Sequence, residues 1–133
     1  MKENLMVTKR IVWIDDDQDI ISAFQPGFES RGWEILSASS AEHGKSLIRR
    51  EKPDLIIMDI IMAGEHGYNA IKDLRNEPDL ANVPIIIYSG VTHRWGDTTA
   101  SRLDAVLAEA DGFVEKSEKP DVLINMVRQQ LES

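Results

Sequence analysis

Four short apolar runs of this chain each lead into side chains that can do chemistry. The run Ile11–Ile14 is followed by the aspartate triplet Asp15–Asp17, and a second run ends at Asp59. Two further runs lead into Ser89 and Lys116. Carboxylates suit a hard divalent cation, while a hydroxyl and an ammonium group can hold phosphoryl oxygens. These residue types predict a site for a cation and a phosphoryl group, provided that one fold brings them together.

The alternation of apolar and amphipathic segments predicts such a fold. Short runs rich in Ile and Val are typical of strands that are buried on both faces of a sheet. The predicted strands are Ile11–Ile14, Trp33–Leu36, Leu55–Met58, Val83–Tyr88 and Gly112–Val114. The predicted helices are Gln18–Ser30, Ala41–Arg50, Tyr68–Asn76, Thr98–Ala110 and Asp121–Leu131. This order indicates an α/β protein with a parallel sheet that is covered by helices on both sides.

Parallel α/β sheets bind their ligands at the carboxyl ends of the strands. Because Asp15, Asp16, Asp59, Ser89 and Lys116 all end or follow predicted strands, we expect them to meet at this edge. Carboxylates that converge repel one another, and a divalent cation such as Mg²⁺ would relieve that repulsion. Asp59 comes from a different strand than the other aspartates, so it is the candidate nucleophile for an acyl phosphate.

The composition bounds the class of protein. The 133 residues predict a single domain over residues 1–133. The 15 Lys and Arg against 23 Asp and Glu give a net charge of −8, which argues against nucleic acid or an anionic membrane as the partner. The absence of cysteine excludes disulfides and thiol catalysis. No run has transmembrane length and the start of the chain lacks a signal-peptide core, so we expect a soluble, cytoplasmic domain.

Local signals mark several boundaries of the predicted elements. Asp17 is expected to cap the helix after the first strand, and Ser39–Glu42 has the pattern of a capping box. Pro120 fits the first turn of the last helix. Pro26 falls inside the first helix, where it is expected to kink or split the helix.

Four segments together resemble the receiver domains of response regulators in two-component signalling. They are Ile11–Ile20, Asp54–Gly67, Pro84–Gly90 and Gly112–Lys116. The resemblance covers about residues 9–132 and suits a stand-alone regulator of the chemotaxis type. It implies a flavodoxin-like (βα)5 fold with a doubly wound sheet of five parallel strands in the order 2-1-3-4-5.

The resemblance also implies a role for each polar residue at the strand ends. Asp59 would receive a phosphoryl group from a histidine kinase or a histidine phosphotransfer protein. Asp16 would bind Mg²⁺ or Mn²⁺ directly beside Asp59, Asp15 would bind it mainly through water, and the backbone carbonyl of Ile61 would be a further ligand. Lys116 would pair with Asp59 and later with the phosphoryl oxygens.

A conformational switch is implied as well. Ser89 would hydrogen-bond the phosphoryl group, and Phe113 would follow it between outward and inward rotamers. The read-out surface would be helix four, strand five and helix five, at about Asp97–Leu131. Output would pass through contact with another protein, without turnover of a substrate and without direct binding to nucleic acid or membrane. A homodimer through the same face is left open.

Some positions depart from the family pattern. Ala63 stands where proline is usual, and His66 stands where an acidic residue is common. Gly90 replaces the usual alanine, which gives the loop more conformational freedom. Ser117 replaces a proline that typically has a cis peptide bond, so a different presentation of Lys116 is expected or a trans bond before Ser117.

The segment before the last strand is longer than usual. Lys116 follows Ser89 by 27 residues, and the extra residues are placed in Val91–Thr99, where Trp95 is expected to pack on a partner or over the site. A tolerated surface insertion is the alternative. Ile61, near the path of an attacking water, suggests a slowly hydrolysed phosphoryl group.

Three other interpretations compete with the receiver. A pseudo-receiver would keep the fold without phosphorylation and act by contact alone. A small phosphatase of the haloacid-dehalogenase type would use Asp15 as its nucleophile and Asp17 as its acid, although Asp19 stands where that family usually has Thr or Val. A flavin-binding protein of the same fold is disfavoured because the acidic edge would repel the flavin phosphate. The chain is expected to be either a stand-alone receiver or part of a larger regulator or hybrid kinase.

Overall fold

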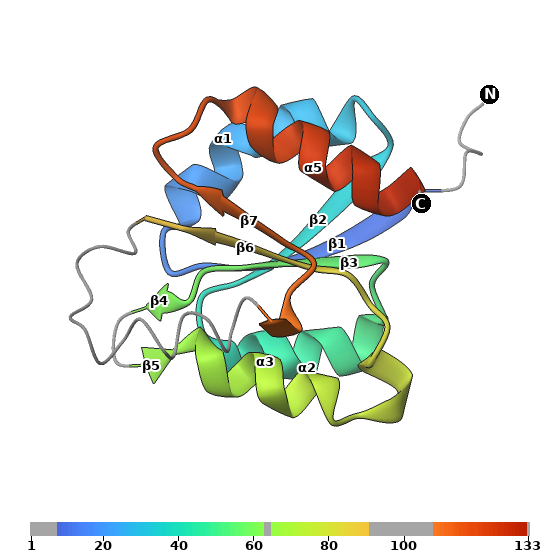
Figure 1. Cartoon of the computed structure of the whole chain (residues 1–133). Coiled ribbons are helices and arrows are strands. Elements are labelled where there is room, and N and C mark those ends of the chain that lie inside the picture. The colour runs from blue at the N-terminus through green and yellow to red at the C-terminus, as the bar shows by residue number, and fades with distance from the viewer. Residues whose placement is uncertain (1–7, 63–64, 91–107, 133) are drawn as a thin grey trace.

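Five parallel strands form the central sheet of the computed structural model, which describes residues 8–62, 65–90 and 108–132. The strands are β1 (Lys9–Ile14), β2 (Trp33–Ala38), β3 (Leu55–Met58), β6 (Ile85–Ser89) and β7 (Gly112–Glu115). Their order in the sheet is β2-β1-β3-β6-β7 (Figure 1). Counted along these five strands, the order is 2-1-3-4-5, which confirms the predicted fold class. Each strand agrees with its predicted apolar run within two residues at either end.

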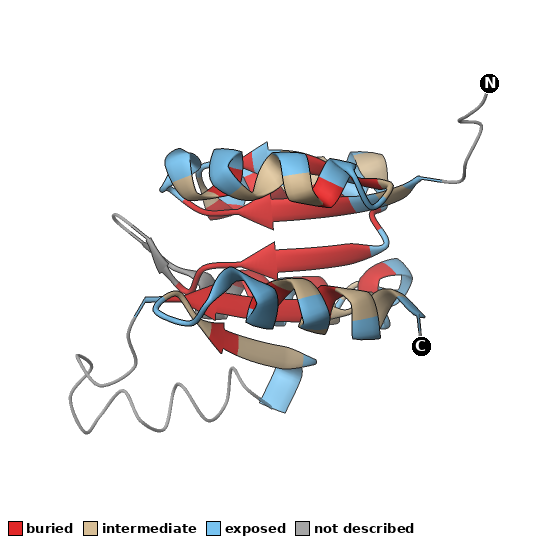
Figure 2. Cartoon of the chain, turned by 90° about the horizontal axis from the view of Figure 1, so that it is seen from above, coloured by how far each residue is buried: buried red, intermediate tan, exposed pale blue. Residues whose placement is uncertain are grey.

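Helices cover both faces of the sheet (Figure 1). They are α1 (Gln18–Glu29) and α5 (Pro120–Glu132) on one face, and α2 (Ala41–Glu51) and α3 (Gly67–Arg75) on the other. β3 and β6 are buried along their whole length, whereas the helices expose their outer sides (Figure 2). Trp13 and Phe28 belong to the apolar cluster beneath α1 and α5, and Ile48 and Ile71 to the cluster beneath α2 and α3. The sheet is thus buried on both faces, as its continuous apolar runs predict.

The helix expected over Thr98–Ala110 lies largely outside the described residues. Of that segment the structure describes residues 108–110, and Ala108 and Glu109 are helical. The expectations for Val91–Thr99 with Trp95, and for Ala63, also fall outside the described residues.

α1 begins at the predicted cap and continues through its proline. The Asp17 carboxylate accepts a hydrogen bond from the backbone N–H of Ile20 at 3.3 Å. The expected split of the helix at Pro26 is wrong, because the helix continues to Glu29. The carbonyl of Pro26 accepts a hydrogen bond from the backbone N–H of Ser30 at 3.0 Å. Pro26 has no N–H to donate to the carbonyl of Ser22. Both residues are exposed, so water can bind that carbonyl instead.

α2 begins one residue later than the predicted capping box requires. Its cap is Ser40, whose hydroxyl accepts a hydrogen bond from the backbone N–H of His43 at 3.2 Å. Glu42 is therefore the second helical residue, whereas a reciprocal capping box needs an acidic or amide side chain at the third. The first helical residue, Ala41, agrees with the prediction, but the capping residue is Ser40 and not Ser39.

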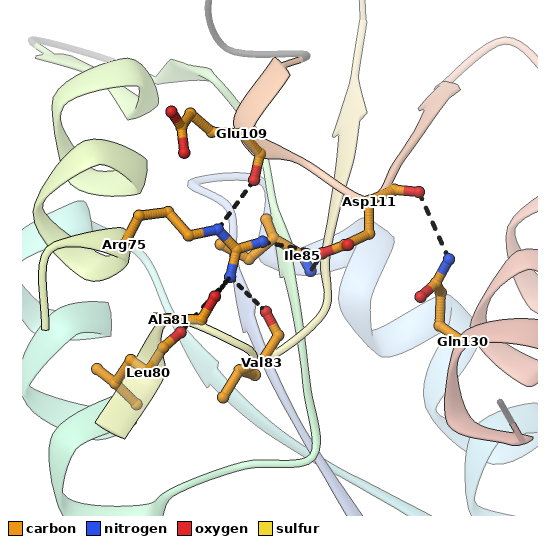
Figure 3. A network of polar contacts seen from close by, with 8 residues as sticks. All are labelled: Arg75, Leu80, Ala81, Val83, Ile85, Glu109, Asp111 and Gln130. Atoms are coloured by element: carbon orange, nitrogen blue, oxygen red, sulfur yellow. Dashed lines mark hydrogen bonds and ion pairs between the residues drawn. The ribbon is translucent and has the colours of Figure 1, made fainter. Parts of the chain in front are cut away.

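Arg75, the last residue of α3, joins several segments at the amino ends of β6 and β7 (Figure 3). Its guanidinium donates hydrogen bonds to the backbone carbonyls of Ala81, Val83 and Glu109, at 3.0, 2.7 and 2.9 Å. It also forms an ion pair with Asp111, with 2.8 Å between Nη2 and Oδ2. One side chain therefore ties the loop before β6 to the helical residues before β7. The sequence patterns did not predict this network.

Three further short elements were not predicted. β4 (Ile61–Met62) and β5 (Glu65–His66) pair in an antiparallel ladder after β3. A 3₁₀-helix, η1 (Pro78–Leu80), follows α3. Elements of two or three residues are too short to show a hydrophobic period, so pattern analysis misses them.

Candidate functional site at the carboxyl ends of the strands

Backbone hydrogen bonds of the sheet extend to the residues that were predicted to form the site. The N–H of Asp59, directly after β3, donates to the carbonyl of Ile14 at 3.0 Å. The N–H of Lys116, directly after β7, donates to the carbonyl of Ser89 at 2.9 Å. Asp15 is joined in the same way to the end of β2. The sheet thus fixes the backbone of all four residues at one edge, where parallel α/β folds bind ligands.

Both carboxylate oxygens of Asp59 are engaged by neighbouring side chains. The Ser89 hydroxyl donates to Oδ1 at 2.8 Å, and the Lys116 ammonium donates to Oδ2 at 2.8 Å. Asp59 and Ser89 are buried, with 3% and 0% of their surfaces exposed. A carboxylate, a hydroxyl and an ammonium group therefore meet in a position largely shielded from solvent, where the hydroxyl and the ammonium group could hold phosphoryl oxygens.

Asp15 is a fully buried carboxylate that is only partly satisfied. Its Oδ1 accepts hydrogen bonds from the Asp17 N–H at 2.9 Å and from Lys116 Nζ at 3.2 Å. Its Oδ2 lies 2.9 Å from Nζ in an ion pair, but without hydrogen-bond geometry to any partner among the described residues. Burial raises the pKa of Asp15, and the charge of Asp59 adds to the rise, while the contacts with Asp17 and Lys116 oppose it.

Lys116 remains a cation in this environment. Burial alone would lower the pKa of its ammonium group, but the hydrogen bonds to Asp59 and Asp15 and their negative charges outweigh burial and raise the pKa. The site thus contains a lasting positive charge between two buried acids.

Three carboxylates of this edge could hold a metal ion. Asp15, Asp16 and Asp59 each offer one oxygen, and the three oxygens lie within 4.8 Å of one another. Asp16 is exposed, which leaves an approach from solvent. The oxygen donors and the unsatisfied Oδ2 of Asp15 fit a hard divalent cation. The carbonyl of Ile61 as a further ligand stays a prediction; the structure places Ile61 in β4, two residues after Asp59.

The departure at Ser117 does not remove Lys116 from the site. The described part of the chain has no cis peptide bond, and Lys116 nevertheless reaches both Asp59 and Asp15. Phe113, the predicted switch residue, is half-buried in β7 and packs against the apolar cluster beneath α2 and α3.

Asp17 takes no part in the acidic cluster and caps α1 instead. A phosphatase that used Asp15 as nucleophile would need Asp17 as its acid, so this geometry does not support that alternative.

Tyr88 is a residue of the site that the sequence patterns did not predict. The ring of Tyr88 lies beneath the Lys116 ammonium, with 6.0 Å between Nζ and the ring centroid. The available signal was its place as an aromatic residue after three isoleucines, directly before Ser89.

Fold and site together define a doubly wound α/β domain with an acidic, lysine-containing site at the carboxyl edge of its sheet. The chain belongs to the response regulator receiver domain family, whose model matches residues 11–128. Receiver domains act in two-component signalling, and phosphorylation of an aspartate with Mg²⁺ is typical of them.

Named relatives agree with this assignment. The probable transcriptional regulator ycf27 of Porphyridium aerugineum is 28% identical, and the match covers 95% of this chain and 49% of ycf27. The protein PilH of Pseudomonas aeruginosa is 33% identical over 59% of this chain and 64% of PilH. The crystal structure of the response regulator TrrA of Thermotoga maritima superposes with a TM-score of 0.79 at 27% identity, covering 93% of this chain and 100% of TrrA.

The matched region is only part of these curated relatives: the chain spans about half of ycf27 and just under two thirds of PilH. Among the described helices, none combines the length and apolar character needed to cross a bilayer.

Proposed function

We propose that Asp59 is the phosphoacceptor of this receiver domain. The observation that carries the proposal is the pairing of its two oxygens with Ser89 and Lys116, each at 2.8 Å. An Asp59 oxygen would attack phosphorus, the new P–O bond would form, and the bond from phosphorus to the donor nitrogen or acyl oxygen would break. Lys116 would hold the charge of the transferred oxygens, and the Ser89 hydroxyl would turn from Asp59 to one of them.

Asp15, Asp16 and Asp59 are the proposed cation ligands, with the carbonyl of Ile61 as a further one. A bound Mg²⁺ or Mn²⁺ would neutralise negative charge on the phosphoryl oxygens. The chain's own contribution is the carboxylate geometry, in which three oxygens lie within 4.8 Å of one another. TrrA was crystallised with Mg²⁺–BeF, which supports a divalent cation in a related receiver.

Read-out is proposed to begin at Ser89 and Phe113. Phosphorylation adds a dianionic group with three acceptor oxygens. The Ser89 hydroxyl would move toward it, and Phe113 would follow between outward and inward rotamers. The surface of about Asp97–Leu131 would carry this change to a partner. We propose that a histidine kinase or phosphotransfer protein supplies the phosphoryl group and that output passes to another protein, without direct contact to nucleic acid.

Further parts of the proposal concern the whole chain. Residues 1–133 would be one receiver domain with a core of about 9–132, which the family match over residues 11–128 supports. The chain would catalyse only its own phosphorylation and dephosphorylation. A cytoplasmic location and a homodimer stay predictions.

Intact-protein mass after incubation with a small acyl phosphate tests the acceptor. We expect the wild type to gain one phosphoryl group with Mg²⁺ and none with EDTA, and Asp59→Asn to gain none. Asp17→Asn is the matched control, because it changes an aspartate of the same edge whose role as a helix cap asparagine can fill. It should be phosphorylated like the wild type.

An unchanged mass of the wild type, both with acyl phosphate and with a phosphorylated histidine phosphotransfer protein as the donor, would favour the pseudo-receiver. Phosphorylation of Asp59→Asn at an equal rate would place the acceptor elsewhere.

A further inference from the structure

The Lys116 ammonium is in contact with an aromatic ring as well as with two carboxylates. It lies over the ring of Tyr88 at 6.0 Å from the centroid, while Asp59 and Asp15 accept its hydrogen bonds at 2.8 and 3.2 Å. A cation at this distance from a ring face is attracted by the ring's negative face, and the attraction grows when both groups lose water. Tyr88 is 4% exposed and the Lys116 side chain is 17% exposed, so this pair is largely shielded from solvent.

The ring of Tyr88 is itself held in place. Successive residues of a strand point to opposite faces, so Tyr88 faces the cluster beneath α1 and α5. Trp13 contacts it edge-on, with centroids 5.8 Å apart and planes at 79°. Phe24 of α1 contacts it at 6.0 Å and 89°. Because Trp13 of β1 is fully buried and packs against Phe24 of α1, the Tyr88 ring has a fixed support behind it.

These contacts restrict where the Lys116 side chain can lie. Lysine is flexible, and two neighbouring carboxylates alone would let its ammonium shift between Asp15 and Asp59. The ring face adds an attraction from a third direction that does not change when Asp59 gains or loses a phosphoryl group. We propose that Tyr88 is a positioning residue, which holds the Lys116 ammonium beside Asp59 for phosphoryl transfer. This inference rests on the proposed role of Asp59 and Lys116.

The inference assigns the effect to the aromatic ring and not to the hydroxyl. Phenylalanine at position 88 should therefore keep the positioning, because it retains the ring face. Leucine fills much of the same space but has no such face, so it should lose the positioning. Phe24→Leu is the matched control, because it removes another ring of the same aromatic cluster, while the buried Trp13 still supports the Tyr88 ring beneath Lys116.

Nuclear magnetic resonance of lysine-labelled protein tests the contact without any phosphorylation. Protons of the Lys116 side chain above the Tyr88 ring should be shifted upfield by its ring current in the wild type, Tyr88→Phe and Phe24→Leu. In Tyr88→Leu they should return toward the shifts of the other lysines. Lys116 resonances without an upfield shift in the folded wild type would overturn the proposal.

Phosphorylation rates with a small acyl phosphate and saturating Mg²⁺ test the consequence. We expect a loss of about 3- to 10-fold in Tyr88→Leu, and a change within about 2-fold in Tyr88→Phe and Phe24→Leu. Thermal unfolding of each variant identifies the temperature at which all are folded. An equal rate loss in Phe24→Leu, or an unchanged rate in Tyr88→Leu, would overturn the positioning role.

The two proposals fail in different ways. A wild type that takes up no phosphoryl group contradicts the proposed function, and the resonances of Lys116 then decide the contact with Tyr88 alone. A wild type that is phosphorylated on Asp59 at the same rate as Tyr88→Leu supports the proposed function and contradicts the inference.

Discussion

At the scale of one residue, Asp15 is a buried carboxylate whose ionisation destabilises the folded protein. It is fully buried, and burial raises the pKa of its carboxyl group above the ordinary value of 3.8. A folded-state pKa above the unfolded one means that the folded protein binds a proton more readily. Stability is therefore lost as pH rises from the unfolded pKa through the folded pKa of Asp15, and the full cost is present above both.

Asp15→Asn should accordingly stabilise the metal-free protein at neutral pH, by about 1–2 kcal/mol. Asparagine keeps an oxygen for the Asp17 N–H, and Lys116 keeps Asp59 as its partner. Urea unfolding in EDTA at pH 8 and at pH 4 measures the effect, and the advantage of the variant should shrink at the lower pH. A variant that is less stable than the wild type at pH 8 would mean that the ionised Asp15 favours folding through Lys116.

The sequence predicts those residues of the site that stand at the ends of strands. Asp15, Asp59, Ser89 and Lys116 directly follow or end strands whose apolar runs are evident, and parallel strands place such residues at one edge. The contact of Lys116 with Tyr88 was not predictable in this way. It depends on side-chain rotamers and on the aromatic support behind the ring, which no spacing along the chain encodes.

At the scale of elements, Arg75 stabilises the fold by joining segments that are distant in the sequence. Its guanidinium, with a side chain 14% exposed, joins the end of α3 to the segments before β6 and β7 (Figure 3). Arg75→Ala would leave several of these carbonyls and the Asp111 carboxylate without their cationic donor. We expect a loss of about 2–3 kcal/mol in the free energy of unfolding, measured in urea.

Arg49→Ala is the control for Arg75. Like Arg75, Arg49 of α2 binds a carboxylate; its Nε and Nη2 lie 2.7 to 3.1 Å from the carboxylate oxygens of Glu77, in the segment after α3. Its side chain is 49% exposed, and exposed ion pairs add little to stability. Similar losses in the two variants would show that Arg75 acts as an ordinary surface ion pair.

Most elements could be predicted because burial leaves a clear pattern in the sequence. β3 is a continuous apolar run, as are Ile11–Ile14 of β1 and Ile85–Tyr88 of β6, and the helices between these strands are amphipathic. The β4–β5 ladder carries no such pattern because each strand has two residues. The cap of α2 was assigned to the wrong register because two serines stand side by side and either could cap the helix.

At the scale of the whole molecule, the site concentrates negative charge on a chain that is already acidic. The net charge is −8, and three carboxylates gather at one edge beside one lysine. Self-repulsion of this kind destabilises a compact state, and a bound cation relieves it. Binding to the folded state alone raises stability by RT ln(1 + [L]/Kd), because the unfolded chain does not assemble the three carboxylates.

Mg²⁺ should therefore raise the unfolding temperature of the wild type, whereas the same ionic strength of Na⁺ should not. At a concentration of about ten times Kd the gain is about 1.4 kcal/mol, which is roughly 3–6 °C for a domain of this size. Asp16→Asn should lose most of the shift, because Asp16 is the exposed member of the cluster, and Asp17→Asn should keep it. The shift should also decline toward acid pH, because protons compete for Asp15, whose pKa is raised by burial. An equal shift in Asp16→Asn would mean that Mg²⁺ stabilises the chain by general screening of its acidic surface and not through these carboxylates.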